Sequence, residues 1–230
     1  MTNSRASKHL FFDLDHTLWD FDKNSQLAFE IIFEKHRIDV KIEEFSAVYE
    51  PINFSLWKQY RENRISKEKL RYSRLKRSFE ALDLEIDDPL IDRLSDDYIK
   101  FLPTNNHLFE GTLELLDYLA PRYRLHIITN GFQEVQQQKL KASNLQPYFE
   151  VVVSSESVAV KKPDPKIFSY ALNKAAARPE QSLMIGDTYE ADILGALNSG
   201  MDAVFFNHRG HAVDREVKQI THLSELKKLL

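Results

Sequence analysis

Acidic side chains stand just after two apolar runs of this sequence, where they could act together. Asp13 and Asp15 follow the first run, Asp187 and Asp192 follow a later one, and Lys162 lies in a proline-containing turn. Four carboxylates in one place repel one another unless a cation lies among them or some are protonated. Hard oxygen ligands in a chain without cysteine favour Mg²⁺. The residue types therefore predict a Mg²⁺ site, provided that the fold brings them together.

Phosphate-binding groups accompany these carboxylates. Thr129, the backbone amides near Asn130 and the ammonium group of Lys162 could hold phosphate oxygens. An aspartate beside Mg²⁺ can attack phosphorus as a covalent nucleophile. A second carboxylic acid two residues later can protonate the leaving oxygen and then deprotonate water. One Asp-x-Asp is common in proteins, so only the whole set, in this order, predicts phosphoryl transfer through an aspartyl phosphate.

The elements that must position these residues read as alternating strands and helices. The short apolar runs lack alternation, which is typical of strands buried on both faces of a parallel sheet. They lie at residues 9–12, 125–128, 149–153, 183–185 and 203–206, and helical stretches are expected at 111–120, 132–143, 165–177 and 190–199. This order predicts an α/β fold with a three-layer, Rossmann-like parallel sheet core. Since ligands bind beyond the carboxyl ends of such strands, the candidate residues should converge at one edge.

More than 100 residues separate the first expected strand from the second, and this gap reads as helical. Tyr72, Leu75, Phe79 and Leu82 step by three or four and mark one apolar stripe. We therefore expect an all-helical cap at 21–103, inserted into a core formed by 1–20 and 104–230. A run of basic residues at 67–77 is interpreted as the solvated face opposite that stripe, rather than as a nucleic-acid site.

Composition excludes several other classes of protein. The 31 basic and 35 acidic residues give a net charge of −4, so a global field for nucleic acid is not expected. With six Gly and eight Pro the chain is not of a fibrous type, and it has no apolar run near the roughly 20 residues of a membrane span. We expect a cytoplasmic protein, monomer or homodimer, with neither nucleic-acid nor membrane partners.

The combined pattern resembles the haloacid dehalogenase-like phosphohydrolases. Their four motifs match Asp13 through Thr17, Thr129, Lys162 before Pro163, and Gly186 through Asp192. The resemblance implies that Asp13 is the nucleophile and Asp15 the general acid/base. It implies Mg²⁺ bound by the Asp13 carboxylate, the Asp15 backbone carbonyl and Asp187. It also places Thr129 and Lys162 on the phosphoryl group, with Asp192 orienting Lys162 or a metal-bound water.

A closer likeness involves the segments 19–21, 53–57, 128–132 and 186–188, which are similar to those of bacterial house-cleaning pyrimidine 5′-nucleotidases. That likeness implies a small phosphorylated metabolite as substrate, a nucleoside monophosphate. Substrate choice would fall to the cap. There Asn53 could hydrogen-bond a base edge, and Trp57 lies four residues later, on the same face of a helix.

Other functions stay open on the sequence. A phosphosugar phosphatase or a phosphomutase would use the same fold and motifs. A dehalogenase is disfavoured because it does not need the second acid at Asp15. A receiver-type phosphoaspartate signalling domain is about half this length and lacks an 80-residue insert, and a binding module that has lost activity would not need four intact motifs.

Overall fold

The computed structural model describes residues 8–214 and 216–230. The chain divides into two compact units, with boundaries between Phe21 and Asp22 and between Asn106 and His107. The first unit therefore contains both ends of the described chain, and residues 22–106 form the second. Each unit is described here by itself.

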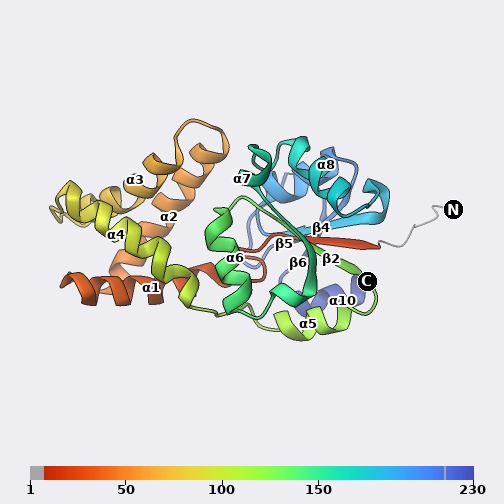
Figure 1. Ribbon diagram of the computed structural model, residues 1–230, viewed down its shortest axis with the longest axis horizontal. Coiled ribbons are helices and arrows are strands. Elements are labelled where there is room, and N and C mark those ends of the chain that lie inside the picture. Colours follow the sequence, from red (N-terminus) through yellow and green to blue (C-terminus); the bar gives the residue numbers. More distant parts are fainter. Residues whose placement is uncertain (1–7, 215) are drawn as a thin grey trace. The chain divides into compact units, whose positions relative to one another are not determined.

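The first unit is built on a six-stranded sheet in the order β3-β2-β1-β4-β5-β6 (Figure 1). The strands are β1 His9–Phe12, β2 Arg124–Thr129, β3 Phe149–Ser154, β4 Ser182–Gly186, β5 Asp202–Phe206 and β6 Lys218–Ile220. All neighbouring strands run parallel, and the order is that of a doubly wound dinucleotide-binding sheet. The prediction of a parallel α/β sheet is thus confirmed. The sequence analysis missed β6, because two of its three residues are exposed and it carries no apolar run.

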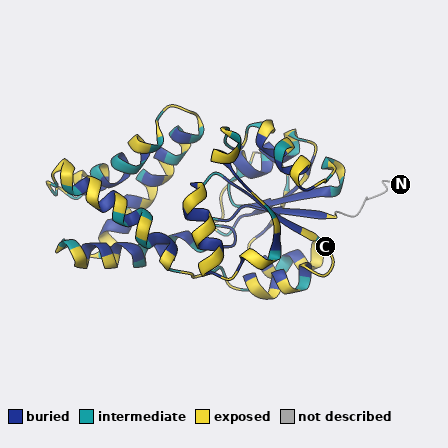
Figure 2. Cartoon of the chain, viewed as in Figure 1, coloured by how far each residue is buried: buried dark blue, intermediate teal, exposed yellow. Residues whose placement is uncertain are grey.

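Helices flank the sheet on both faces, α8 on one and α5 with α10 on the other (Figure 1). Their bounds are α5 Thr112–Leu119, α6 Gln133–Ala142, α7 Ser155–Val158, α8 Pro165–Lys174, α9 Gly195–Asn198 and α10 Leu226–Leu229. Figure 2 shows the strands largely buried and the helices exposed along one side. Phe11, Ile128, Phe168 and Met184 belong to one buried cluster. Each such side chain stabilises the fold by about 1.5–3 kcal/mol relative to an exposed position.

The register of the central strands determines where their carboxyl ends meet. Phe12 of β1 lies opposite Ile127 of β2 and Ile185 of β4. The backbone N–H of Asp13 continues the ladder by donating to the Ile185 carbonyl at 2.9 Å. The residues that follow β1, β2 and β4 consequently emerge at the same edge of the sheet.

The second unit consists of four helices, α1 Phe21–His36, α2 Ile42–Arg61, α3 Lys67–Glu80 and α4 Asp88–Phe101; the first of these starts at the boundary of the units. Its core is aromatic, with Phe29 packed on Phe45 and Tyr98 at ring distances of 4.8 and 4.6 Å. Two side chains cap helix N-termini, since Ser66 accepts from the Lys69 amide and Asp87 from the Leu90 amide.

The interpretation of the basic run 67–77 as a solvated face is wrong at Arg74. This side chain is 2% exposed, and its guanidinium lies 4.5 Å from the centre of the Tyr98 ring. Helix α3 contacts both α2 and α4, so its buried face is wider than the stripe through Leu75 and Phe79. Among that stripe's expected members, Tyr72 is only half-buried and donates to Asp88.

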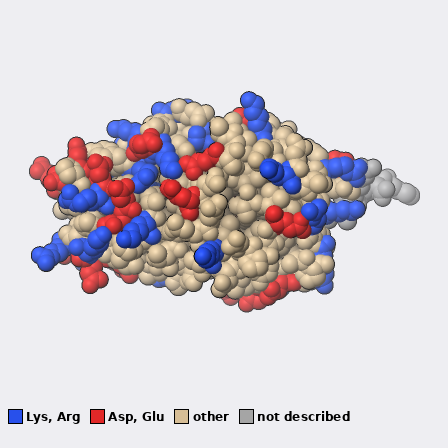
Figure 3. Space-filling view, viewed as in Figure 1, with Lys and Arg blue, Asp and Glu red and all other residues tan. Residues whose placement is uncertain are grey.

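Other members of the run do lie at the surface and pair with acids. Arg71 contacts Asp96 at 2.7 Å and Lys76 contacts Asp88 at 3.2 Å. Figure 3 shows blue and red side chains intermixed over the helical unit on the face drawn. Among the helices that the structure describes, none is long and apolar enough to cross a membrane.

Candidate active site

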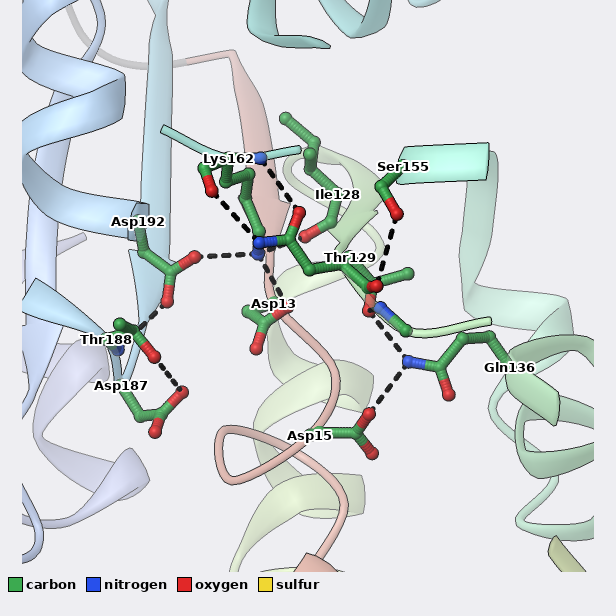
Figure 4. A network of polar contacts seen from close by, with 12 residues as sticks. Asp13, Asp15, Ile128, Thr129, Gln136, Ser155, Lys162, Asp187, Thr188 and Asp192 are labelled. Atoms are coloured by element: carbon green, nitrogen blue, oxygen red, sulfur yellow. Dashed lines mark hydrogen bonds and ion pairs between the residues drawn. The ribbon is translucent and has the colours of Figure 1, made fainter. Parts of the chain in front are cut away.

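Three strand ends and one loop bring the predicted residues together at the carboxyl edge of the sheet (Figure 4). Asp13 follows β1, Thr129 ends β2 and Asp187 follows β4. Lys162 comes from the loop between α7 and α8, 149 positions from Asp13 in sequence. As expected from the strand positions, four side chains from distant parts of the chain lie at this edge.

Lys162 is the centre of the cluster and is 2% exposed. Its ammonium group donates to Asp13 Oδ1 at 2.6 Å and to the Ile128 carbonyl at 2.6 Å, and it pairs with Asp192 Oδ1 at 2.7 Å. Two hydrogen bonds and one ion pair thus hold the ammonium group in place. Burial lowers the pKa of Lys162, but the charges of Asp13 and Asp192 outweigh it and raise that pKa above the usual value. Lys162 is therefore a fixed positive charge beside Asp13.

Burial and neighbouring charges disfavour the ionised forms of two carboxylates in the cluster. Burial, together with the charge of Asp192, raises the pKa of Asp13 to about 7, although Lys162 counteracts the shift. Burial and the charges of Asp192 and Asp13 raise the pKa of Asp187 well above its usual range. Burial is the largest cause of both shifts and the neighbouring carboxylates add to it, so a further cation at this place would favour the ionised forms.

A divalent cation fits this arrangement. One oxygen from each of Asp13, Asp187 and Asp192 lies within 4.8 Å of the others. Asp192 is already occupied by Lys162 and by the Thr188 N–H at 2.9 Å, which leaves Asp13 and Asp187 as the available pair. Two carboxylates facing each other, with raised pKa values, are hard oxygen donors of the kind that Mg²⁺ takes. The predicted contribution of the Asp15 backbone carbonyl stays a prediction.

Asp192 reaches Lys162 because of local backbone features. A π-helix, Tyr189–Leu194, stands where an ordinary helix was expected. A Cβ on Gly186 would lie 2.4 Å from Asp192 Oδ2, so only glycine lets the carboxylate fold back against the end of β4. The Gly186-Asp187 pair is thus explained by the packing of Asp192 as well as by the turn.

Asp15 points away from Lys162 and is held by helix α6. Its Oδ2 accepts from Gln136 Nε2 at 2.9 Å, and its Oδ1 accepts from Lys139 Nζ at 2.5 Å. The sequence analysis expected a helix here but did not single out Gln136 or Lys139. Their spacing of three, with Leu140 next, puts them on the inward face of α6, and this was the available signal.

Thr129 and Asn130 have different surroundings. Thr129 Oγ1 accepts from Gln136 Nε2 at 2.7 Å and from the Gly131 N–H at 3.1 Å. The Asn130 side chain instead bonds to both backbone groups of Lys162, at 2.8 and 3.1 Å. It fixes the loop that carries the lysine, so any phosphate contact by residue 130 would come from its backbone amide.

The predicted base-contacting pair lies on α2, in the helical unit. Asn53 is buried, and its Oδ1 has no hydrogen-bond partner among the described residues. Trp57 is half-buried, with its ring edge-on to Tyr60 at 5.5 Å. The two residues are one turn apart on α2, as predicted, and their role stays a prediction.

The model of the haloacid dehalogenase-like hydrolases matches residues 10–206, so the chain belongs to this family. It is 34% identical over 200 residues to the pyrimidine 5′-nucleotidase YjjG of Escherichia coli, covering 86% of this chain and 85% of that protein. It is 35% identical over 202 residues to the pyrimidine 5′-nucleotidase PynA of Streptococcus pneumoniae, covering 87% and 84%.

A further relative is the glyceraldehyde 3-phosphate phosphatase of Methanothermobacter thermautotrophicus, 29% identical over 241 residues, with 97% and 99% of the two chains covered. Among solved structures, the HAD-hydrolase YfnB of Bacillus subtilis bound to magnesium superposes with a TM-score of 0.88 at 28% identity, covering 97% of this chain and 98% of that one. The resemblance seen in the sequence is thereby confirmed at the level of the family.

Proposed function

We propose that the protein is a Mg²⁺-dependent phosphatase that hydrolyses nucleoside 5′-monophosphates, pyrimidine ones in particular, through an aspartyl phosphate. The observation that carries the proposal is the buried Asp13–Lys162–Asp192 chain, with Asp187 facing Asp13 at the carboxyl edge of the sheet. It provides a carboxylate nucleophile, a fixed cation and a pair of metal ligands at one place.

In the first step, one carboxylate oxygen of Asp13 attacks the phosphorus atom of the monoester. The bond to the ester oxygen breaks, and Asp15 donates a proton to that oxygen so that it leaves as an alcohol. Asp13 then carries the phosphoryl group as a mixed anhydride. Lys162, 2.6 Å from Asp13 Oδ1, is placed to offset the charge on the phosphoryl oxygens.

In the second step, Asp15 accepts a proton from water as the water attacks the same phosphorus. The anhydride bond breaks, inorganic phosphate leaves and the Asp13 carboxylate is restored. Asp13 and Asp187, with the Asp15 carbonyl, would hold Mg²⁺, and the ion would offset negative charge on the reacting groups. Thr129 would donate its hydroxyl hydrogen to a phosphoryl oxygen.

Selection of the nucleoside is assigned to the helical unit. The unpartnered Asn53 carbonyl can accept from a base N–H, and Trp57 offers a ring on which a base can stack. Arg74 supports this assignment, because its buried Nε and Nη2 also have no hydrogen-bond partner among the described residues. Pyrimidine bases, like guanine, present both carbonyl oxygens and N–H groups, which match this mixture of donors and acceptors, so the preference for pyrimidines rests on the relatives. The two nucleotidase relatives point to the same substrates.

A phosphosugar phosphatase is the second candidate, and one observation favours it. The glyceraldehyde 3-phosphate phosphatase relative is matched over 97% of this chain, more than either nucleotidase. A phosphomutase would need to return the phosphoryl group from Asp13 to an acceptor hydroxyl before water takes it, so isomer formation without free phosphate would identify it.

A phosphate-release screen distinguishes these functions. The purified protein is assayed with pyrimidine and purine 5′-monophosphates, triose and hexose phosphates, and p-nitrophenyl phosphate, each with Mg²⁺ or EDTA. The proposal predicts the highest kcat/KM for a pyrimidine monophosphate and no turnover in EDTA. A higher kcat/KM for a triose phosphate would favour the phosphosugar phosphatase. If no ester released phosphate, both proposed functions would be overturned.

A further inference from the structure

Both carboxylate oxygens of Asp15 accept a hydrogen bond from the same helix. Helix α6 supplies a donor to each of its oxygens, the ammonium group of Lys139 to Oδ1 at 2.5 Å and the amide of Gln136 to Oδ2 at 2.9 Å. Figure 4 shows the contact from Gln136. A general acid/base must exchange a proton through one of these two oxygens. Each oxygen accepts one bond here and keeps a second lone pair, so one oxygen can exchange the proton while the contact to the other keeps the carboxylate in place.

Lys139 is itself held firmly. It is 1% exposed, and its ammonium group lies 4.0 Å from the centre of the Trp19 ring and 5.1 Å from that of Phe21. A lysine buried to this degree keeps its charge only with compensation, which the Asp15 carboxylate and the two ring faces provide. The contact is thus built into the core of the unit and is not a surface ion pair of marginal strength.

Gln136 connects Asp15 to the phosphate-binding motif. Its single amide nitrogen donates both to Asp15 Oδ2 and to Thr129 Oγ1, at 2.9 and 2.7 Å. A Cβ on Gly131 would lie 2.3 Å from this nitrogen, so the glycine after Asn130 makes room for the amide. The carbonyl oxygen of Gln136 is buried without a hydrogen-bond partner among the described residues. The side chain is therefore oriented by its nitrogen, toward Asp15 and Thr129.

We propose that Lys139 and Gln136 are positioning residues for the general acid/base, a role that rests on the proposed function. Lys139 anchors Oδ1 throughout the reaction. Oδ2 exchanges the proton, because the bond from a neutral amide is weaker than the charge-assisted bond from Lys139. Gln136 is itself held in place during this exchange by its bond to Thr129.

This assignment predicts a specific kinetic signature. The ratio kcat/KM reports steps up to the departure of the leaving group, and an alkoxide needs the proton from Asp15 whereas p-nitrophenolate leaves without it. The turnover number of p-nitrophenyl phosphate also includes hydrolysis of the aspartyl phosphate, where Asp15 acts as base. Misplacing Asp15 should therefore spare kcat/KM for the aryl ester while lowering its kcat.

The test uses Lys139→Met, which keeps a long apolar side chain against Trp19, and Gln136→Met. For Lys139→Met, kcat/KM for the preferred alkyl phosphate should fall about 100-fold, in line with the loss of general acid catalysis. For p-nitrophenyl phosphate, kcat/KM should change less than about threefold, and a burst of p-nitrophenol equal to the enzyme concentration should precede slow turnover. Gln136→Met should also lower kcat/KM for the alkyl ester more than for the aryl ester, with a smaller loss than Lys139→Met. Lys139→Arg should recover part of the activity.

Lys141→Met is the matched control, because Lys141 is an exposed lysine on the same helix, and it should behave as the wild type. In an Asp15→Asn background, Lys139→Met should cause no further loss. Equal losses of kcat/KM for both esters, or a further loss in that background, would overturn the proposal. If circular dichroism shows that Lys139→Met does not fold, Gln136→Met and Lys139→Arg provide the test instead, through the same comparison of kcat/KM for the two esters. A wild type without phosphatase activity would instead refute the proposed function.

Discussion

The candidate catalytic charges at the sheet edge are paired, whereas two candidate substrate contacts in the helical unit keep polar atoms that are unpaired within the described part of the chain. Unpaired buried atoms as such occur in both units, and Gln136 Oε1 is one in the sheet unit. At the sheet edge, Lys162 has two hydrogen-bond acceptors and a third contact, to a carboxylate, and both oxygens of Asp15 have donors. In the helical unit, Asn53 Oδ1 and two guanidinium nitrogens of Arg74 are buried without hydrogen-bond partners among the described residues. An unsatisfied buried group costs about 1–3 kcal/mol, so such groups are retained in small numbers.

The difference indicates that the two units contact different parts of the substrate. The sheet edge is organised in advance for one constant chemical group, the phosphoryl group, and pre-organised charges need little rearrangement during the reaction. For the helical unit we propose that donors and acceptors are kept available for the variable part of the substrate. If this is correct, changes at the sheet edge should affect every substrate, and changes at Asn53, Trp57 or Arg74 should affect only some.

The largest effect is expected at the nucleophile. Asp13→Asn keeps the shape of the side chain but removes the attacking oxygen anion, so kcat should fall by about 10⁴-fold or more for all esters. Stopped-flow or endpoint phosphate assays with a nucleotide and with p-nitrophenyl phosphate would measure it. Mass spectrometry of the quenched wild type should show a phosphorylated Asp13 peptide that the variant lacks. Comparable turnover in the variant would exclude the covalent route.

Removing the metal should have the next largest effect. Asp13 and Asp187 face each other with pKa values raised by burial and by neighbouring carboxylates, so they should not both stay ionised and correctly placed without a cation. EDTA should abolish turnover of all esters and Mg²⁺ should restore it, while Ca²⁺ should inhibit because its coordination is looser. Asp187→Asn should raise the Mg²⁺ concentration needed for half-maximal rate. Full activity after thorough chelation would contradict the assignment of the pair.

A smaller and selective effect is expected in the helical unit. Trp57→Ala and Asn53→Ala should each raise KM for a pyrimidine monophosphate about tenfold, the equivalent of roughly 1.4 kcal/mol of lost contact. Turnover of p-nitrophenyl phosphate, which lacks the base, should stay within about twofold of the wild type. Phe54→Ala is a matched control, since Phe54 is the exposed aromatic residue between them. Equal losses for both esters would show that Trp57 only supports the packing of its helices.

The sequence predicted the sheet edge better than the helical unit for a physical reason. Parallel strands order their carboxyl ends whatever the loops contain, so Asp13, Thr129 and Asp187 could be placed from strand positions alone. The burial of Arg74 depends on α3 being packed on two sides, and helical periodicity does not show how many neighbours a helix has. The partners of Asp15 were missed because Gln136 and Lys139 are more than 120 positions away from it.

The smallest effect concerns stability, and it tests whether the sheet edge is strained without a metal. The pKa of Asp13 is raised to about 7 in the folded protein, and burial is the largest cause. An aspartate in the unfolded chain has a pKa of about 4. Between these values the folded state binds more protons than the unfolded state. The free energy of unfolding should therefore fall as the pH rises through this window.

Asp13→Asn removes this titration and also the Asp13 charge that helps to raise the pKa of Asp187, so the comparison of variant and wild type reports the pair. His126, whose pKa burial lowers to about 4, contributes with the opposite sign over the same range, but equally in both proteins, and it cancels in the difference. In EDTA, the Tm of Asp13→Asn should match the wild type near pH 4.5 and exceed it by a few degrees at pH 7.5. Differential scanning fluorimetry across this range would measure the gap. Added Mg²⁺ should close or reverse it, because only the wild type has both Asp13 and Asp187 to bind the ion. A gap that stays constant with pH would mean that Asp13 is not strained in the metal-free protein.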